Sequence, residues 1–178
     1  MELTDIAATE KWTELERKIN RRSGLNAAVF NREGVRITNF VKWANNLCPV
    51  VKADEKGKNY ICALAHQNIA AQAEQTARPV IEECDGGLMK LAVPIFINGQ
   101  FLGVAGGCGY ILDSGEVDLF MIHKATGIAE EKLAALSEGI PVMTREQALA
   151  QIAFIENEID AMINGQVEIF SERVEFAK

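Results

Sequence analysis

The residues of this chain with the clearest capacity for chemistry are its four cysteines: Cys48, Cys62, Cys84 and Cys108. They are separated by 13, 21 and 23 intervening residues and include no Cys-x-x-Cys pair, so the spacing is not that of a zinc finger or ferredoxin. Cys48 stands beside Pro49, and Cys84 precedes Asp85-Gly86-Gly87, which places both at bends of the chain. We expect the four thiols to converge in one pocket and to ligate a metal. The alternative is that each is a small buried apolar residue, as free cysteines often are.

The neighbours of the cysteines extend this candidate site. Cys62 and His66 are four residues apart on an expected helix, so His66 is a reserve ligand should one cysteine point away. Cys108 lies among glycines, which allow a bulky group to approach the backbone. A small-molecule ligand would instead lie between the sheet and the helices that carry Trp43 and Tyr60. The expected contacts of a bound cofactor are Gly86, Gly87, Gly107 and Trp43.

Composition and motifs exclude several classes of protein. The 178 residues carry a net charge of −7, which argues against a nucleic-acid-binding surface. No apolar run approaches the roughly 20 residues of a membrane span, and the acidic start is not a secretory signal. Neither a phosphate-binding loop nor a hydrolase or metalloprotease motif is present, so we expect no enzymatic activity. The cytoplasm is the expected location, where free thiols rather than disulfides are the rule.

Hydrophobic periodicity predicts a mixed α/β (α+β) domain. We expect an antiparallel five-stranded sheet with helices on one face and helical arms at both ends. The strands are predicted at 25–30, 35–38, 80–83, 89–97 and 101–111, with the hairpin signal Asn98-Gly99 between the last two. The helices are predicted at 4–22, around 43–51, and at 60–77, 114–125 and 129–136, with a long final helix that Thr144 caps. Asp54–Asn59 is expected to be a loop.

The final helix carries an apolar seam. Its members recur at steps of four and three residues: Ala148, Ile152, Ile155, Ile159 and Met162. The pattern continues more weakly through Ile169 and Phe176, and Gln166 and Arg173 also fall on the seam. An apolar seam needs a partner, which the stripe on the first helix supplies in part. We therefore expect a sensory domain over 1–143 and a signalling and dimerisation helix over 144–178, with a parallel homodimer through the terminal helices.

An ordered set of short motifs resembles the PocR sensory domain family over about 15–110. They are Cys48-Pro49, Cys62, Pro79-Val80-Ile81, Cys84 to Leu88, Pro94-Ile95, Asn98-Gly99 and Leu102-Gly103. The resemblance implies a PAS-like fold found in transcription regulators, sensor kinases and chemoreceptors, and recognition of small hydrocarbon derivatives. The family's cysteines match Cys48, Cys62 and Cys84. This chain departs from the family in having Asp85-Gly86-Gly87-Leu88 where His-Ala-Gly-Leu is frequent, and in its additional Cys108.

Together these observations predict a non-enzymatic, cytoplasmic sensory domain that passes a signal to a downstream output domain. The favoured input is a metal centre held by the four cysteines. An iron–sulfur cluster is preferred for redox or oxygen sensing, because a structural zinc would supply no input. Two alternatives remain open: a binding module for a small organic molecule, and a dimerisation scaffold whose cysteines belong to the core. Neither nucleic acid nor a membrane is an expected partner of this fragment.

Overall fold

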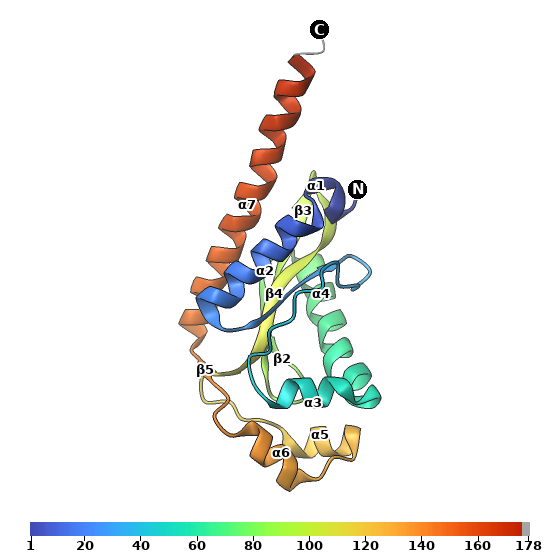
Figure 1. Cartoon of the computed structure of the whole chain (residues 1–178), viewed down its shortest axis with the longest axis vertical. Helices are drawn as coiled ribbons and strands as arrows, with labels where there is room; N and C mark the ends of the chain where they lie inside the picture. Colours follow the sequence, from blue (N-terminus) through green and yellow to red (C-terminus); the bar gives the residue numbers. More distant parts are fainter. Residues whose placement is uncertain (176–178) are drawn as a thin grey trace.

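The structure, a computed structural model, describes residues 1–175, with side chains as far as residue 164 (Figure 1). Its helices are α1 (Leu3–Ile6), α2 (Thr9–Ser23), α3 (Leu47–Ala53), the π-helix η1 (Gly57–Ala63), α4 (Leu64–Thr76), α5 (Leu119–Thr126), α6 (Glu130–Ser137) and α7 (Arg145–Glu175). The strands are β1 (Asn26–Asn31), β2 (Val80–Glu83), β3 (Met89–Ile97), β4 (Gln100–Leu112) and β5 (Val142–Met143). No helix of the described part of the chain is long and apolar enough to cross a bilayer.

One five-stranded sheet organises the domain. The order is β1-β4-β3-β2 with antiparallel neighbours, and the short β5 pairs with the end of β4 in parallel. Asn98 and Gly99 both have positive φ, 51° and 77°, which is the conformation that a tight hairpin turn requires. The prediction of an α+β fold of PAS-like type is confirmed.

The prediction of a strand over 35–38 is wrong, and β5 supplies the fifth strand instead. Only an isolated bridge from Phe30 to Arg36 remains of the expected pairing. The reason is that side chains hold this segment. Arg36 donates to the carbonyl oxygens of Ala27 and Phe40, and Thr38 donates to the carboxylate of Glu16. These bonds turn the chain away from the ladder towards α2.

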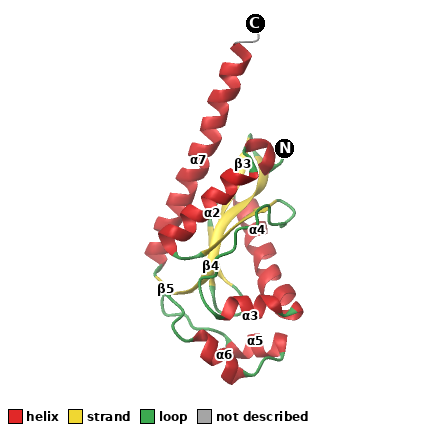
Figure 2. Ribbon diagram, in the orientation of Figure 1, coloured by secondary structure: helices red, strands yellow, loops and turns green. Residues whose placement is uncertain are grey.

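Helices cover both faces of the sheet (Figure 2). The terminal helices α2 and α7 pack on one face, where Trp12, Ile19 and Ile155 are buried against strand residues such as Leu91 and Val93. The segment from α3 through η1 to α4 covers the other face, with Ile69 and Ala73 packed against Ala92 and Val104. Alternation along each strand divides these two cores. The second face is the one that carries the cysteines.

The final helix begins as expected. Thr144 Oγ1 accepts a hydrogen bond from the backbone N–H of Gln147 at 3.1 Å, and Gln147 Oε1 accepts one from the N–H of Thr144 at 2.9 Å. This reciprocal pair is a capping box. The apolar seam packs within the domain's own core: Ala148, Ile152, Ile155 and Ile159 are buried, and Met162 packs against them. Gln166, Ile169 and Arg173 lie in α7 beyond the described side chains, and Phe176 lies outside the described residues.

Two further boundaries differ from expectation. The predicted helix 4–22 is divided into α1 and α2, because the indole N–H of Trp12 donates to the carbonyl oxygens of Leu3 and Ala7 at the break. The expected loop 54–59 runs instead into the π-helix η1. There Gly57 packs so closely that a Cβ atom would stand 2.3 Å from the carbonyl oxygen of Val51. Short π-helical segments occur frequently at functional sites, and η1 carries Cys62.

Candidate functional site

A small cavity lies between the sheet and the covering segment α3–η1–α4. Its volume is about 40 Å³, and all four cysteines of the chain line it together with His66 and Lys90. The thiols come from separate elements: Cys48 from α3, Cys62 from η1, Cys84 from the turn after β2, and Cys108 from β4. We call this space the cysteine cavity. Residues distant in sequence converge here because the segment folds back over the sheet.

Three neighbouring strands form the floor of the cysteine cavity. Asn26 of β1 pairs with Cys108 of β4, and Cys108 pairs in turn with Lys90 of β3. Residues at paired positions point to the same face, so an amide, a thiol and an ammonium group stand in a row. The Asn26 side-chain oxygen is buried and has no hydrogen-bond partner among the described residues. The floor is therefore polar, although it lies within a core.

Lys90 is the unusual member of this floor. It is 6 % exposed, and its Nζ lies 3.0 Å from Nε2 of His66. None of the ion pairs among the described side chains joins Lys90 to a carboxylate. Burial and the adjacent Lys90 hold the pKa of His66 well below its usual value. The imidazole is thus neutral, and because an ammonium group can only donate, Nε2 is the acceptor.

Burial also raises the pKa values of three cysteine thiols. It raises the pKa of Cys48 to about 12, an effect that the nearby Cys108 reinforces. Burial raises the pKa of Cys62 and of Cys84 as well, and in both cases the positive charge of Lys90 opposes the rise. The metal-free thiols of Cys48, Cys62 and Cys84 are consequently protonated at neutral pH. A metal that binds thiolates would release these protons, which makes its binding pH-dependent.

The segment before α3 closes one side of the cysteine cavity. Asn45 accepts from the N–H of Cys48 at 2.7 Å, and its amide group donates to the carbonyl oxygen of Gly109 at 2.6 Å and to Cys48 Sγ at 3.3 Å. Trp43 lines the cavity and is 37 % exposed, with Nζ of Lys52 5.7 Å from its ring centre. Asn45 thereby fixes Cys48, while the partly exposed Trp43 lines the same cavity.

Of the four residues expected to contact a cofactor, two lie at the cysteine cavity and two lie elsewhere. Trp43 lines the cysteine cavity. Gly86 lies beside it, since a Cβ atom there would be 3.6 Å from Cys84 Sγ. Gly107 faces Leu25 on the opposite face of the sheet, and Gly109 rather than Gly107 lines the cavity. Gly87 packs against the carbonyl oxygen of Glu116.

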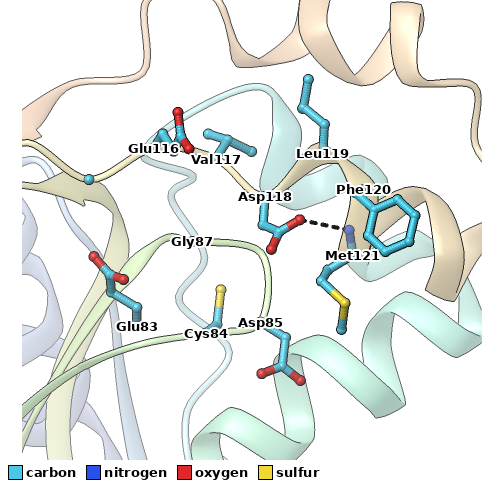
Figure 3. Close-up of a pocket in the computed structure, with 11 residues that line it drawn as sticks. Glu83, Cys84, Asp85, Gly87, Glu116, Val117, Asp118, Leu119, Phe120 and Met121 are labelled. Atoms are coloured by element: carbon cyan, nitrogen blue, oxygen red, sulfur yellow. Dashed lines mark hydrogen bonds between the residues drawn. The ribbon is translucent and has the colours of Figure 1, made fainter.

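A larger, open pocket of about 740 Å³ lies outside the cysteine cavity (Figure 3). Its lining includes Glu83, Asp85, Glu116 and Asp118 as well as Cys84, which therefore lines both spaces. Asp118 is engaged in capping α5, where its carboxylate accepts from the N–H of Met121 at 2.8 Å. The pocket gives the Cys84 turn an acidic outer surface.

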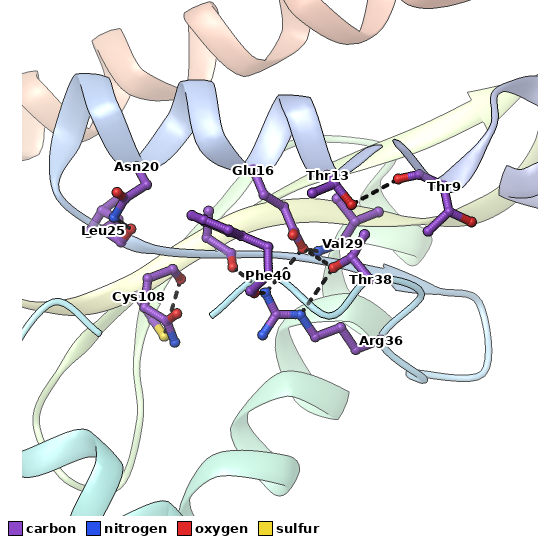
Figure 4. A network of polar contacts seen from close by, with 12 residues as sticks. Thr9, Thr13, Glu16, Asn20, Leu25, Val29, Arg36, Thr38, Phe40 and Cys108 are labelled. Carbon is purple, nitrogen blue, oxygen red and sulfur yellow. Dashed lines mark hydrogen bonds and ion pairs between the residues drawn. The ribbon is translucent and has the colours of Figure 1, made fainter. Parts of the chain in front are cut away.

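A buried polar network connects α2 to residues 36–40, the segment that leads to Trp43 (Figure 4). The carboxylate of Glu16 is fully buried, and its Oε1 accepts from the N–H of Val29 at 2.9 Å, from Thr38 at 2.6 Å and from Arg36 at 3.2 Å. Burial raises the pKa of Glu16, and the bonds from Thr38 and Arg36 counteract that rise. Glu16 thus anchors the segment that runs on to Trp43 and the cysteine cavity.

The donor groups of the cysteine cavity do not form the shell of a single metal ion. Among the side chains that the structure describes, those of residues 1–164, no three of His, Cys, Asp or Glu stand close enough to hold a single metal ion. The cysteines therefore surround the cavity at a wider spacing than the tetrahedral shell of one zinc ion. Four thiol groups from four elements nevertheless suit a larger, sulfur-ligated group chemically.

Sequence reasoning did not single out Lys90, Asn26 or Asn45, and it included Gly109 only among the glycines around Cys108. Only Lys90 carried a signal: it is a charged residue within the otherwise apolar strand 89–97. The other residues depend on strand register and on the path of a loop, which no local pattern specifies.

Comparison with known proteins gave one family match. The model of the family described as "Sensory domain found in PocR" matches residues 5–166, nearly the whole chain. No curated protein and no solved structure matches the chain.

Proposed function

Because the chain belongs to the PocR sensory domain family, we propose that it receives its signal at the cysteine cavity, where the four thiols hold an iron–sulfur cluster. The observation that carries this proposal is that every cysteine of the chain lines one 40 Å³ cavity, although each comes from a different element. Cys48, Cys62 and Cys84 also pack against one buried apolar cluster, so it is their shared cavity with Cys108, rather than burial alone, that supports a common role.

Two features favour a cluster over a single zinc ion. The described ligands are too widely spaced for one ion, whereas a multi-iron cluster holds its cysteines further apart. The cavity also contains the ammonium group of Lys90, which pairs with no carboxylate among the described side chains and suits a thiolate-bound group of net negative charge. When bound, a cluster would supply a change of oxidation state, and hence redox or oxygen sensing. Such chemistry and free thiols both suit a reducing compartment, so we expect the domain to work in the cytoplasm.

The protein's own residues would translate events in the cavity into movement of α7. Cys108 lies on β4, whose opposite face packs against the buried seam of α7. The helices α2 and α7 are also joined directly, by the ion pair between Lys18 and Glu158 at 2.6 Å and by Arg22 over the ring of Phe154. A displacement of β4 would therefore reach α7 through packed side chains.

The element that would transmit the signal is α7, which Figure 1 shows extending past the sheet. We propose that residues 144–178 act as a signalling helix, that two chains associate in parallel through their terminal helices, and that a downstream output domain follows in the full protein. Sedimentation at increasing protein concentration tests the association. A monomer at high concentration would contradict the dimer and leave the sensory assignment in place.

The direct test of the input is chemical analysis after anaerobic purification. The wild-type protein should be brown and contain iron and acid-labile sulfide. Each of four variants, Cys48→Ser, Cys62→Ser, Cys84→Ser and Cys108→Ser, should lose most of both while keeping its circular dichroism spectrum. A colourless wild-type protein without iron or sulfide after anaerobic reconstitution would refute the cluster.

A second candidate is a metal-free site for a small organic molecule, in which the cysteines are structural. The unpartnered amide oxygen of Asn26 and the buried Lys90 favour it, since both could bind a polar ligand. The volume of about 40 Å³ limits such a ligand to a few heavy atoms, and a cluster in the same space would require the segment α3–η1–α4 to move away from the sheet. Thermal stabilisation of colourless, metal-free protein by short-chain diols or alcohols would support this candidate.

A further inference from the structure

Burying the ammonium group of Lys90 costs free energy, and no ion pair among the described side chains offsets that cost. Transferring an ammonium group into a protein core is unfavourable unless a negative charge accompanies it. Lys90 is 6 % exposed, and its polar partner is the neutral ring of His66 at 3.0 Å. The carboxylates of the open 740 Å³ pocket do not supply this negative charge, because none of them forms an ion pair with Lys90.

The position of Lys90 relates it to the cysteines rather than to the surface. It stands next to Cys108 in the register of β3 and β4, and it lines the cysteine cavity with all four thiols. The missing anion is therefore to be sought inside the cavity.

We propose that Lys90 is a positioning residue whose ammonium group compensates the negative charge of the thiolate-bound cluster, while His66 holds the side chain towards the cavity. This inference rests on the cluster of the proposed function. It explains why a charged residue interrupts the apolar strand β3 at the one position that faces the cysteines.

The test compares Lys90→Met with wild type in two states. In the metal-free protein, Met removes an uncompensated buried charge, so the melting temperature should stay the same or rise. In the reconstituted protein, loss of the counter-charge should release iron to a chelator about tenfold faster or more, as loss of outer partners of metal ligands typically does. A purely structural lysine would instead lower the melting temperature of the metal-free protein.

Two further variants make the outcome specific. Lys58→Met makes the same change at an exposed lysine of η1 and should release iron at the wild-type rate. Lys90→Arg retains the positive charge and should recover most of the iron retention that Lys90→Met loses. If Lys90→Met retains iron as well as wild type does, the role of Lys90 is refuted and the cluster stands. If wild type itself assembles no cluster, the proposed function fails, and the role of Lys90 fails with it.

Discussion

Replacement of Glu16 by alanine tests the link between α2 and the cover of the cysteine cavity. The Glu16 carboxylate is fully buried and accepts three hydrogen bonds, from Val29, Thr38 and Arg36. Glu16→Ala would leave the Val29 N–H without an acceptor and Arg36 without its counter-ion. The chain from Thr38 to Trp43 would then lose its attachment to α2.

The magnitude follows from these contacts. Removing one partner of a buried ion pair costs about 3–5 kcal/mol. Arg36 has a side chain that is 16 % exposed and keeps the carbonyl oxygens of Ala27 and Phe40, so we expect the lower end, about 3 kcal/mol. Glu16→Gln retains an acceptor for Val29 and Thr38, and should cost about 1–2 kcal/mol.

Urea denaturation followed by circular dichroism measures these changes in the free energy of unfolding. The matched control is Glu14→Ala on the same helix. Glu14 pairs with Arg21 at the surface, with side chains 48 % and 68 % exposed, and should cost no more than about 0.5 kcal/mol. A Glu16→Ala protein within 1 kcal/mol of wild type would refute the reasoning about this network.

Three further outcomes are expected. In the metal-free protein, folding raises the pKa of Cys48 from 9.0 to about 12, so between these values only the unfolded chain ionises this thiol. The free energy of unfolding should therefore fall by about 1.4 kcal/mol per pH unit above pH 9. Urea melts at a series of pH values measure this slope, and Cys48→Ala should reduce it. Gly109→Ala should lower the melting temperature and hinder cluster assembly, because φ is +106° and the new methyl group would stand 2.9 Å from Ala44 Cβ; Gly34→Ala, also at positive φ but in open space, shows the backbone effect alone. Cys84→Ser should abolish visible absorbance without unfolding the domain, and unchanged iron content would indicate a core role for this thiol.

The sequence predicts local elements here much better than long-range placement. Alternation of apolar residues identifies β3, and the capping residues identify the start of α7 correctly. The strand expected at 35–38 failed because Arg36 and Thr38 bond to Glu16, some twenty residues away in the sequence. Local periodicity contains no information about such a buried partner.

In the candidate site, too, local features were predicted better than long-range ones. Bends and glycines indicated where cysteine side chains could gather, and all four do line one cavity. The polar floor was missed because it depends on the register that sets Asn26 beside Cys108 and Cys108 beside Lys90. Strand alternation would place Gly107 and Gly109 on the same face. A register shift between Met89 and Lys90 leaves Gly109 without a partner on β3, and this irregularity, which the sequence does not reveal, lets Gly109 rather than Gly107 line the cavity.

The most direct test of the central claim is a crystal structure of anaerobically prepared protein, with anomalous scattering measured at the iron absorption edge. We expect one strong peak inside the cysteine cavity, surrounded by the sulfur atoms of Cys48, Cys62, Cys84 and Cys108. A cavity without anomalous signal in iron-containing crystals, or iron bound elsewhere on the molecule, would contradict the claim that these thiols form the input site.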